Sequence, residues 1–253
     1  MKTMIAIPCM DTVPTQFMER LLALYRPDGT MIITARSSLI YDARNILSKM
    51  AIDQGYDRIM WLDSDMVFPS DLLDRLSADM DTGKRYVSGM YFTRKNPIHP
   101  VIYRETGYRQ EAGGTVPYCT PVDDKQYTTS LMESFDYTVS GKNNPDGVFK
   151  ASSTEKENKY LFEVAATEKE NKYLFEVKAT GMGCCLMETS VIQEVFNHFG
   201  LPFTPMPGFG EDLSFCRRCE ELGIQMWCDS SLQCGHIAQK VVGINEYKGG
   251  LVL

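Results

Sequence analysis

The chain lacks several features that would assign it to a membrane or to nucleic acid. No segment approaches the roughly 18 consecutive apolar residues that a membrane-spanning helix needs. The formal net charge is −7, and no stripe of Lys and Arg stands out that would neutralise a nucleic-acid backbone. Pro8 interrupts the first apolar run, so no signal peptide is indicated. These absences predict a cytoplasmic protein without membrane spans and without broad nucleic-acid binding.

The chain also lacks a recognisable cysteine framework, although it contains 8 cysteines. Cys216 and Cys219 fall in a helical pattern, but no second Cys/His pair follows them at zinc-finger spacing. Cys184 and Cys185 are neighbours in an apolar run, where strand geometry points them to opposite faces. We therefore predict reduced, mostly buried thiols instead of zinc ligands or disulfides.

Apolar runs alternate with amphipathic segments in the first third of the chain. The runs predict strands at 4–8, 31–34, 58–62 and 86–91. The amphipathic segments predict helices from Thr15 to Leu24, from Ser38 to near Gly55, and from Pro69 onward. Such alternation is typical of βαβ units, and 253 residues are enough for one large domain. The expected fold class is α/β, with a mostly parallel central sheet flanked by helices.

The segment at 97–180 has a different composition, rich in Thr, Tyr, Gly and Pro, and predicts a small antiparallel β element with long loops. Residues 154–164 recur letter for letter at 167–177, and each copy holds a predicted strand, at 159–164 and 172–177. The two copies either form a β-hairpin, or one copy is paired and the other loops out. After residue 180 the patterns predict a strand, a helix ending at Gly200, a helix beginning at Glu211, and a strand at 224–228.

The most informative stretch runs from Arg58 to Met66, where an apolar strand ends in Asp63-Ser64-Asp65. Strand alternation points Asp63 and Asp65 to the same side, and carboxylates held that close repel one another unless a cation lies between them. Mg²⁺ or Mn²⁺ suits such a pair. Ligands of parallel sheets bind beyond the carboxyl ends of the strands, where this motif falls. The alternative is a solvated turn that caps the following helix.

Three features far away in the sequence would complete a site with this motif. Glu211 and Asp212 follow a glycine-rich loop, and they are either a simple helix N-terminus or a pair that binds sugar hydroxyls and accepts a proton. Arg44 either pairs with a diphosphate through its guanidinium fork or forms an ion pair on the helix surface. His236, preceded by Gly235, is either a metal ligand or a structural histidine.

Four blocks of sequence carry a family resemblance. Ala43-Arg44-Asn45 followed by Trp61-Leu62-Asp63-Ser64-Asp65 resembles the helix and DxD strand of glycosyltransferase family two. The block at 210–215 and the Gly-His ending at 234–237 are similar to those of polypeptide N-acetylgalactosaminyltransferases. The resemblance covers 4–95 and 180–237. It implies a single GT-A (Rossmann-like) domain over 1–253, with a nucleotide-binding half at 1–95, a variable segment at 97–180 and an acceptor or catalytic half at 180–253.

The resemblance implies a metal-dependent glycosyltransferase that moves a sugar from a nucleotide-diphosphate sugar (a UDP- or GDP-sugar) to a hydroxyl acceptor. Asp65 would hold Mn²⁺ or Mg²⁺, with Asp63 directly or through water, and His236 would be a further ligand. The ion would neutralise charge on the departing nucleoside diphosphate. The acceptor and the oligomeric state are left open by these residues.

The same resemblance assigns the donor and the catalytic residues. Pro8 would lie beside the nucleobase, and Ser64 and Arg44 would contact the donor. In inverting relatives a carboxylate at the position of Asp212 deprotonates the acceptor hydroxyl, whereas in retaining relatives the position of Glu211 binds donor-sugar hydroxyls. The acidic block is of the inverting kind and the Gly-His ending is of the retaining kind, so both stereochemical outcomes stay open.

Two other classes of function compete with this hypothesis. A nucleotidyltransferase that makes nucleotide-sugars needs a glycine-rich, basic phosphate loop after the first strand, and residues 9–12 do not form one. The third class is a non-catalytic nucleotide- or carbohydrate-binding module. The stretch at 91–95 either lines the donor site or is a solvated strand end, and His99 is expected to be an ordinary loop residue.

Overall fold

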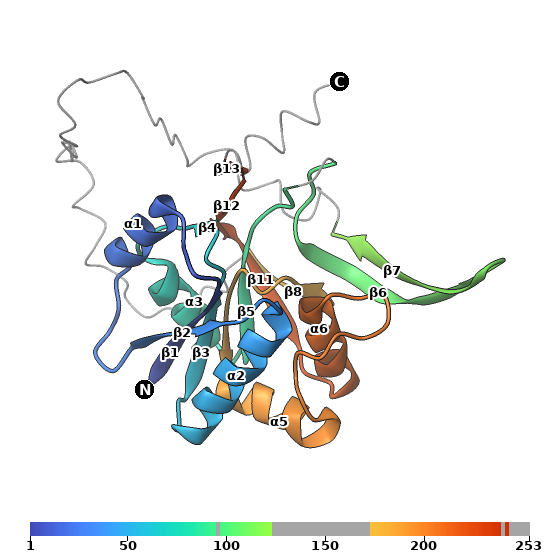
Figure 1. The fold of residues 1–253 in the computed structure, drawn as a ribbon, viewed down its shortest axis with the longest axis horizontal. Coiled ribbons are helices and arrows are strands. Elements are labelled where there is room, and N and C mark those ends of the chain that lie inside the picture. The colour runs from blue at the N-terminus through green and yellow to red at the C-terminus, as the bar shows by residue number, and fades with distance from the viewer. Residues whose placement is uncertain (95–96, 123–172, 239–240, 243–253) are drawn as a thin grey trace.

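The computed structural model describes residues 1–94, 97–122, 173–238 and 241–242. In these ranges the largest element is a 7-stranded sheet in the order β2-β1-β3-β10-β5-β11-β8 (Figure 1). Its strands are β1 (Thr3–Cys9), β2 (Met31–Arg36), β3 (Arg58–Leu62), β5 (Tyr86–Met90), β8 (Leu174–Val177), β10 (Cys184–Glu188) and β11 (Met226–Gln233). The four strands predicted in the first third are present, each with ends that shift by at most a few residues.

The sheet is mostly parallel, as the alternation of strands and helices predicted. β1 is parallel to β2 and β3, and β5 is parallel to β11. β10 is antiparallel to both of its neighbours, β3 and β5, so that β5 runs in the same direction as β3. β8 is antiparallel to β11 at the edge. The reversed β10 in the middle of the sheet is a feature that the sequence pattern did not indicate.

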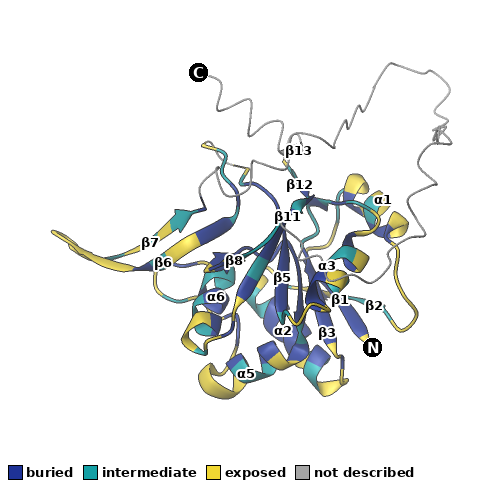
Figure 2. Cartoon of the chain, turned by 180° about the vertical axis from the view of Figure 1, so that it is seen from behind, coloured by how far each residue is buried: buried dark blue, intermediate teal, exposed yellow. Residues whose placement is uncertain are grey.

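Helices cover both faces of the sheet (Figure 1). They are α1 (Thr15–Ala23), α2 (Ile40–Asp53), α3 (Leu72–Met80), α5 (Thr189–Phe199) and α6 (Glu211–Glu221). In β1, Met4 and Ala6 belong to the core shared with α2, α5 and α6, whereas Ile5 and Ile7 belong to the core shared with α1 and α3. Alternate residues of a strand point to opposite faces, and here both faces are covered, so the strand is buried along its length (Figure 2).

Two predicted helix starts differ from the structure. α2 begins at Ile40, after a turn in which the Ser37 hydroxyl accepts a hydrogen bond from the Leu39 amide. α3 begins at Leu72, after a turn closed by the bond from the Leu72 amide to the Pro69 carbonyl. In both cases the residues predicted to open the helix form a turn before it. The apolar face predicted for α3 is confirmed, because its four inward positions are buried: Leu72, Leu73, Leu76 and Met80.

The middle segment contributes the predicted antiparallel element. β6 (Ile102–Glu111) and β7 (Gly114–Pro121) form a hairpin that extends from the body of the protein, and β9 (Ala179–Thr180) pairs with the base of β6 (Figures 1 and 2). In the second repeat copy, β8 pairs with β11. The first copy, and with it the choice between a hairpin and a looped-out copy, lies outside the described residues.

A third, smaller sheet brings the C-terminal segment to the end of β3. It contains β4 (Met66–Val67), β12 (Gly235–Ile237) and β13 (Val241–Val242), with β12 in the centre. None of the 8 cysteines, which all lie in the described ranges, forms a disulfide in the structure, and six of them are buried, as predicted for mostly buried thiols. Over the described ranges, no helix is long and apolar enough to cross a membrane.

Candidate active site

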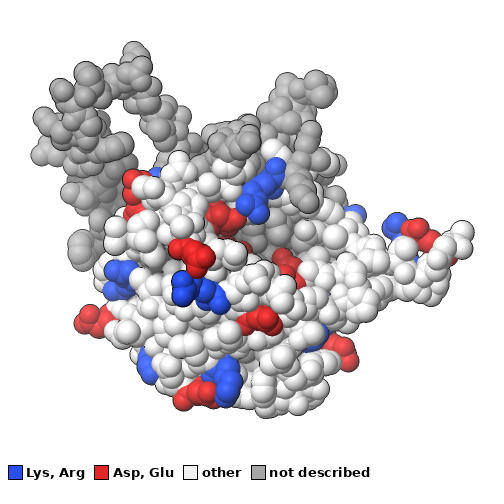
Figure 3. Space-filling model, viewed as in Figure 1, with Lys and Arg blue, Asp and Glu red and all other residues white. Residues whose placement is uncertain are grey.

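A pocket of about 540 Å³ opens where β1, β3 and β5 reach their carboxyl ends. Its lining comes from the ends of these strands, the start of α2, the segment before β6, the start of α6 and β12: Pro8, Ile40, Asp63, Ser64, Asp65, Tyr91, Thr93, Arg94, Pro97, His99, Val101, Asp212 and His236. In the view of Figure 3, acidic and basic side chains are interspersed over the surface, without a continuous field of one sign. Because the pocket opens at the carboxyl ends of β1, β3 and β5, it lies where ligands of α/β sheets bind.

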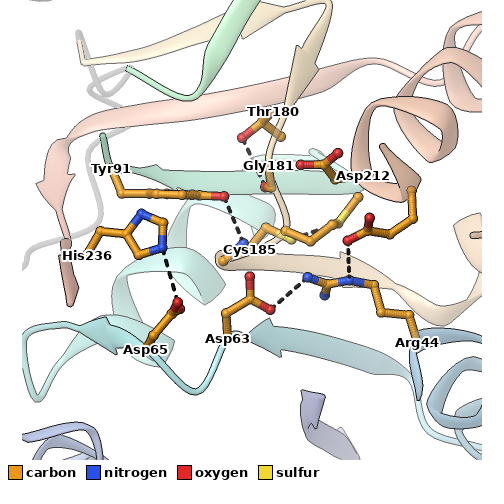
Figure 4. Close-up of polar contacts among 12 residues, drawn as sticks. Arg44, Asp63, Asp65, Tyr91, Thr180, Gly181, Cys185, Asp212 and His236 are labelled. Carbon is orange, nitrogen blue, oxygen red and sulfur yellow. Dashed lines mark hydrogen bonds and ion pairs between the residues drawn. The ribbon is translucent and has the colours of Figure 1, made fainter. Parts of the chain in front are cut away.

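Asp63 is neutralised by a buried arginine at the back of the pocket. The Arg44 Nη2 donates to Asp63 Oδ1 at 2.7 Å, and the Arg44 side chain is only 1% exposed. Burial raises the pKa of the Asp63 carboxyl, and the positive charge of Arg44 opposes this rise without cancelling it. Arg44 also reaches Glu211, with 3.4 Å between Nε and Oε1. One guanidinium thus joins the end of β3 to the start of α6 (Figure 4).

Asp65 has different partners, and these face the pocket. Its Oδ2 accepts a hydrogen bond from Arg94 Nη1 at 2.8 Å, and it lies 3.4 Å from His236 Nε2. Burial raises the pKa of Asp65, but the hydrogen bond and charge of His236 and the charge of Arg94 outweigh it, so the net pKa is lowered. The repulsion expected between Asp63 and Asp65 is thus offset by one arginine for each carboxylate.

His236 reaches Asp65 because the backbone of β12 is paired with β4. His236 lies opposite Met66, and the Ile237 amide donates to the Asp65 carbonyl at 2.7 Å. The other ring nitrogen, His236 Nδ1, lies 3.0 Å from the Phe92 carbonyl oxygen. Since a carbonyl only accepts, Nδ1 carries a proton, and Nε2 is the ring nitrogen that faces Asp65.

Tyr91 forms one wall of the pocket beside His236. The two rings meet edge to face, 5.7 Å apart, and the Tyr91 hydroxyl accepts a hydrogen bond from the Gly183 amide at 3.0 Å (Figure 4). Gly181 and Gly183 leave the space for this ring, because a Cβ at either position would overlap the tyrosine. Burial raises the pKa of Tyr91 well above its usual value, so the hydroxyl stays protonated.

Asp212 lines the pocket from the first turn of α6, on the α6 side in Figure 4. Its Oδ1 accepts a hydrogen bond from the Leu213 amide at 2.7 Å. Burial and the neighbouring charge of Glu211 raise the pKa of Asp212 to about 6, against the weaker effects of the Leu213 amide and Arg44. Asp212 is thus deprotonated at neutral pH, yet it is more basic than an ordinary aspartate.

The structure brings most of the predicted residues into one pocket. Six of them line it: Pro8, Asp63, Ser64, Asp65, Asp212 and His236. Arg44 and Glu211 lie behind the lining as an ion pair in which the Arg44 side chain is buried, so the surface ion pair considered for Arg44 is wrong. The helix-cap alternative for the Asp-Ser-Asp motif is also wrong, because α3 begins only at Leu72.

Sequence reasoning left two lining residues undecided and missed a third, and it assigned no role to Asn45. Tyr91 and Arg94, from the undecided stretch at 91–95, line the pocket, and so does His99, which was expected to be an ordinary loop residue. The signal for Tyr91 and Arg94 was their position after the carboxyl end of a strand, the same signal that located Asp63. Asn45 also has a role that was not assigned, because its Oδ1 accepts a hydrogen bond from the Phe203 amide at 2.9 Å and holds the loop before α6.

The fold and this site together define a Rossmann-like α/β protein with a charged pocket at the carboxyl edge of its sheet. No protein-family model and no curated protein matches the chain. Among solved structures it is similar to A197 from STIV, with a TM-score of 0.59, 16% identity, and coverage of 97% of this chain and 92% of that chain. At this identity the likeness supports the fold alone.

A second solved structure has a weaker likeness to the chain. It is CMP:2-keto-3-deoxy-manno-octonic acid synthetase complexed with CTP, with a TM-score of 0.39, 12% identity, and coverage of 90% of this chain and 89% of that chain. That TM-score is too low to establish a shared fold. The function of this chain therefore has to be argued from its own pocket.

Proposed function

We propose that the chain is a metal-dependent glycosyltransferase with a GT-A-like fold, which transfers a sugar from a nucleotide-diphosphate sugar to a hydroxyl acceptor. The observation that supports this proposal most strongly is the approach of His236 Nε2 to Asp65 Oδ2, 3.4 Å apart in the pocket. These residues lie far apart in the sequence, and a short backbone pairing of β4 with β12 brings them together. Such a pair suits a divalent ion and a diphosphate.

The donor chemistry of this pair fits a divalent cation. When His236 is neutral with its proton on Nδ1, its Nε2 lone pair and the Asp65 carboxylate oxygen are two electron-pair donors that one cation can bind. A cation between them satisfies both groups, and the bond from Nδ1 to the Phe92 carbonyl is the type of outer contact that orients metal-binding histidines. Within the described ranges, no three His, Cys, Asp or Glu side chains converge. We therefore expect water and phosphate oxygens to complete the shell, as is usual for Mg²⁺ and Mn²⁺.

The chain's own residues would position the donor around this ion. Asp65 and His236 would hold the ion directly, and Asp63, fixed by Arg44, would face it through water. The ion would supply Lewis-acid stabilisation of the departing nucleoside diphosphate, of UDP or GDP type. Pro8, at the end of β1, would lie against the nucleobase.

Asp212 is the residue that we propose as general base. Its raised pKa, about 6, matches a group that must be ionised at neutral pH and still accept a proton from an acceptor hydroxyl. Glu211 would act through Arg44, because its carboxylate is directed to that guanidinium and does not line the pocket. This arrangement argues for a catalytic site and against a module that only binds.

The loop after β1 favours a glycosyltransferase over a nucleotidyltransferase. Residues 10–14 contain neither glycine nor lysine, so they do not form a cradle for a triphosphate. Asp11 in this loop pairs with Arg36 at the end of β2, with 3.0 Å between the two charged atoms, and both side chains are exposed. The loop at 10–14 has no basic side chain that could neutralise the charge of a triphosphate, and Arg36 nearby is paired with Asp11.

The proposal is tested by screening UDP- and GDP-sugars for release of nucleoside diphosphate that depends on Mn²⁺ or Mg²⁺. We expect release with at least one donor, and its loss in Asp65→Asn with the fold retained by circular dichroism. Asp28→Asn, at an exposed loop position, is the matched control and should leave release unchanged. Release of pyrophosphate from CTP or UTP with sugar phosphates, instead of diphosphate from nucleotide-sugars, would replace the proposal with nucleotidyl transfer.

A further inference from the structure

Arg94 occupies the side of Asp65 where the proposed ion would bind. Its Nη1 lies 2.8 Å from Asp65 Oδ2, the same oxygen that faces His236, and 3.4 Å from the Ile237 carbonyl. The guanidinium therefore bridges the Asp-Ser-Asp motif and β12, at the junction that the ion would share. The roles proposed for the metal ligands and the general base do not explain why an arginine lies at this point.

A divalent ion on Asp65 and an arginine on the same oxygen exclude one another. Two positive groups a few ångströms apart repel, and they compete for the same lone pairs. Arg44 cannot leave Asp63, because its side chain is 1% exposed and also bound to Glu211. Arg94 is in the opposite situation, because its side chain is 48% exposed and borders an open pocket. Of the two arginines, only Arg94 can change partner without exposing a buried charge.

The diphosphate of the donor is the partner that Arg94 would gain. A planar guanidinium binds phosphate oxygens with two parallel hydrogen bonds, and such charge-assisted bonds are stronger than neutral ones. A diphosphate that bridges the ion at Asp65 would place its oxygens within the same pocket that Arg94 lines. Arg94 would exchange one carboxylate for the phosphate oxygens and remain paired throughout.

We infer that Arg94 couples metal binding to donor binding: it holds Asp65 in the metal-free protein and moves to the donor diphosphate when a divalent ion takes Asp65. This inference rests on the proposed function. Because the arginine opposes the ion alone and favours the ion with its diphosphate, Mn²⁺ and nucleoside diphosphate should bind with positive coupling. The arginine would thereby weaken metal binding in a pocket that holds no donor.

The experiment measures two affinities separately in the full chain. Mn²⁺ alone is titrated by the EPR signal of the free ion, and UDP and GDP are titrated by calorimetry at saturating Mn²⁺. In Arg94→Gln we expect Mn²⁺ alone to bind about threefold tighter, because a competing exposed ion pair is removed. We expect the nucleoside diphosphate to bind roughly tenfold weaker, because a charge-assisted contact is lost.

Two further variants separate this role from a structural one. Arg94→Lys keeps the charge, so Mn²⁺ alone should bind as in the unmodified protein, while the diphosphate affinity is restored only in part. Arg109→Gln, which removes an exposed arginine paired with Glu111 on β6, should change neither affinity.

The inference is overturned if Arg94→Gln weakens both affinities together or changes neither, while the unmodified protein binds Mn²⁺ and a nucleoside diphosphate. If the unmodified protein binds neither Mn²⁺ nor UDP nor GDP, the proposed function fails as well. The two failures are therefore distinguished by the unmodified protein alone.

Discussion

The buried Arg44 guanidinium and the Asp63 carboxylate at the pocket wall form an ion pair, 2.7 Å long, that joins α2 to the end of β3. The same guanidinium lies 5.5 Å from the centre of the Trp61 ring and binds Glu211 through its Nε. The carboxylates of Asp63 and Glu211 raise the pKa of Arg44 above its ordinary value, although burial opposes this. Arg44 is thus the cation around which the back of the pocket is built.

Removal of this cation should cost a large part of the stability of the protein. Arg44→Met leaves the carboxylates of Asp63 and Glu211 without their partner in a poorly solvated place. We expect the free energy of unfolding, measured by denaturant titration, to fall by about 3–5 kcal/mol. The control is Arg109→Gln, where an exposed pair is lost and the change should stay within about 0.5 kcal/mol. Equal losses in the two variants would show that Arg44 contributes no more to the free energy of unfolding than an exposed arginine does.

The pH dependence of transfer should report the ionisation of Asp212. Its pKa is raised to about 6, and a general base must be deprotonated, so kcat/KM should fall as the pH drops below about 6. The residual activity of Asp212→Asn should lack this acidic limb. A limb that persists near pH 6 in the variant would assign the ionisation to another group.

The same carboxylate should reduce stability at neutral pH. A folded-state pKa above the ordinary 3.8 means that the folded protein holds this proton more tightly than the unfolded chain, so stability falls as the pH rises from about 4 to 6. Asp212→Asn should therefore be more stable than the unmodified protein above pH 6, by about 1–3 kcal/mol, and the gain should vanish near pH 4. Denaturant titrations at pH 4 and 7.5 measure this difference. A variant that is less stable at pH 7.5 would contradict the assignment.

The position of the Tyr91 ring in the pocket wall should require glycine at residue 181. In Gly181→Ala the new Cβ overlaps the Tyr91 hydroxyl, and we expect a loss of about 1–3 kcal/mol in the free energy of unfolding. Combining Gly181→Ala with Tyr91→Phe should recover part of the loss, because the overlapping hydroxyl is removed. The matched control is Gly113→Ala, where a Cβ meets no atom within 4 Å. A harmless Gly181→Ala would show that the tyrosine is not held there.

The position of the loop before α6, and with it the stability of the protein, should depend on the Asn45 side chain. Its side-chain oxygen accepts the hydrogen bond of the buried Phe203 amide, so Asn45→Leu leaves that amide without its partner. We expect a loss of about 1–3 kcal/mol by denaturant titration. Asn197→Leu, at a solvent-facing position of α5 where the side chain accepts a hydrogen bond from Gln193, should change the stability by less than about 0.5 kcal/mol.

The parts of the fold that follow local patterns could be predicted from the sequence. The strand at 58–62 has the predicted limits, because a short apolar run between Gly55 and the Asp-Ser-Asp motif admits only one register. The direction of β10 could not be predicted, because an apolar strand buried on both faces reads the same whether it is parallel or antiparallel. Direction is set by the connections, and the long connection from β5 to β10, which includes 123–172 and the repeat, allows either direction.

Some residues of the site could likewise be predicted from a local pattern, and others could not. Asp63 and Asp65 could be located because they follow a strand, and the same rule applied to β5 favours the pocket-lining role of Tyr91 and Arg94, one of the two alternatives left open for 91–95. The role of Arg44 could not be read from its helix, because a polar residue in an amphipathic pattern is normally placed on the surface. Its burial depends on Asp63 and on Glu211, which is distant in the sequence, and no local pattern encodes that pairing.

The central claim is that Asp65 and His236 hold the same divalent ion. The most direct measurement is pulsed EPR of the Mn²⁺-loaded protein, which detects the magnetic coupling of a histidine nitrogen bound to the ion. The chain has 3 histidines, and His99 also lines the pocket, so both positions are tested. We predict a nitrogen coupling in the unmodified protein that is lost in His236→Gln and kept in His99→Gln. A protein without such a coupling, or a coupling that survives in His236→Gln, would contradict the account.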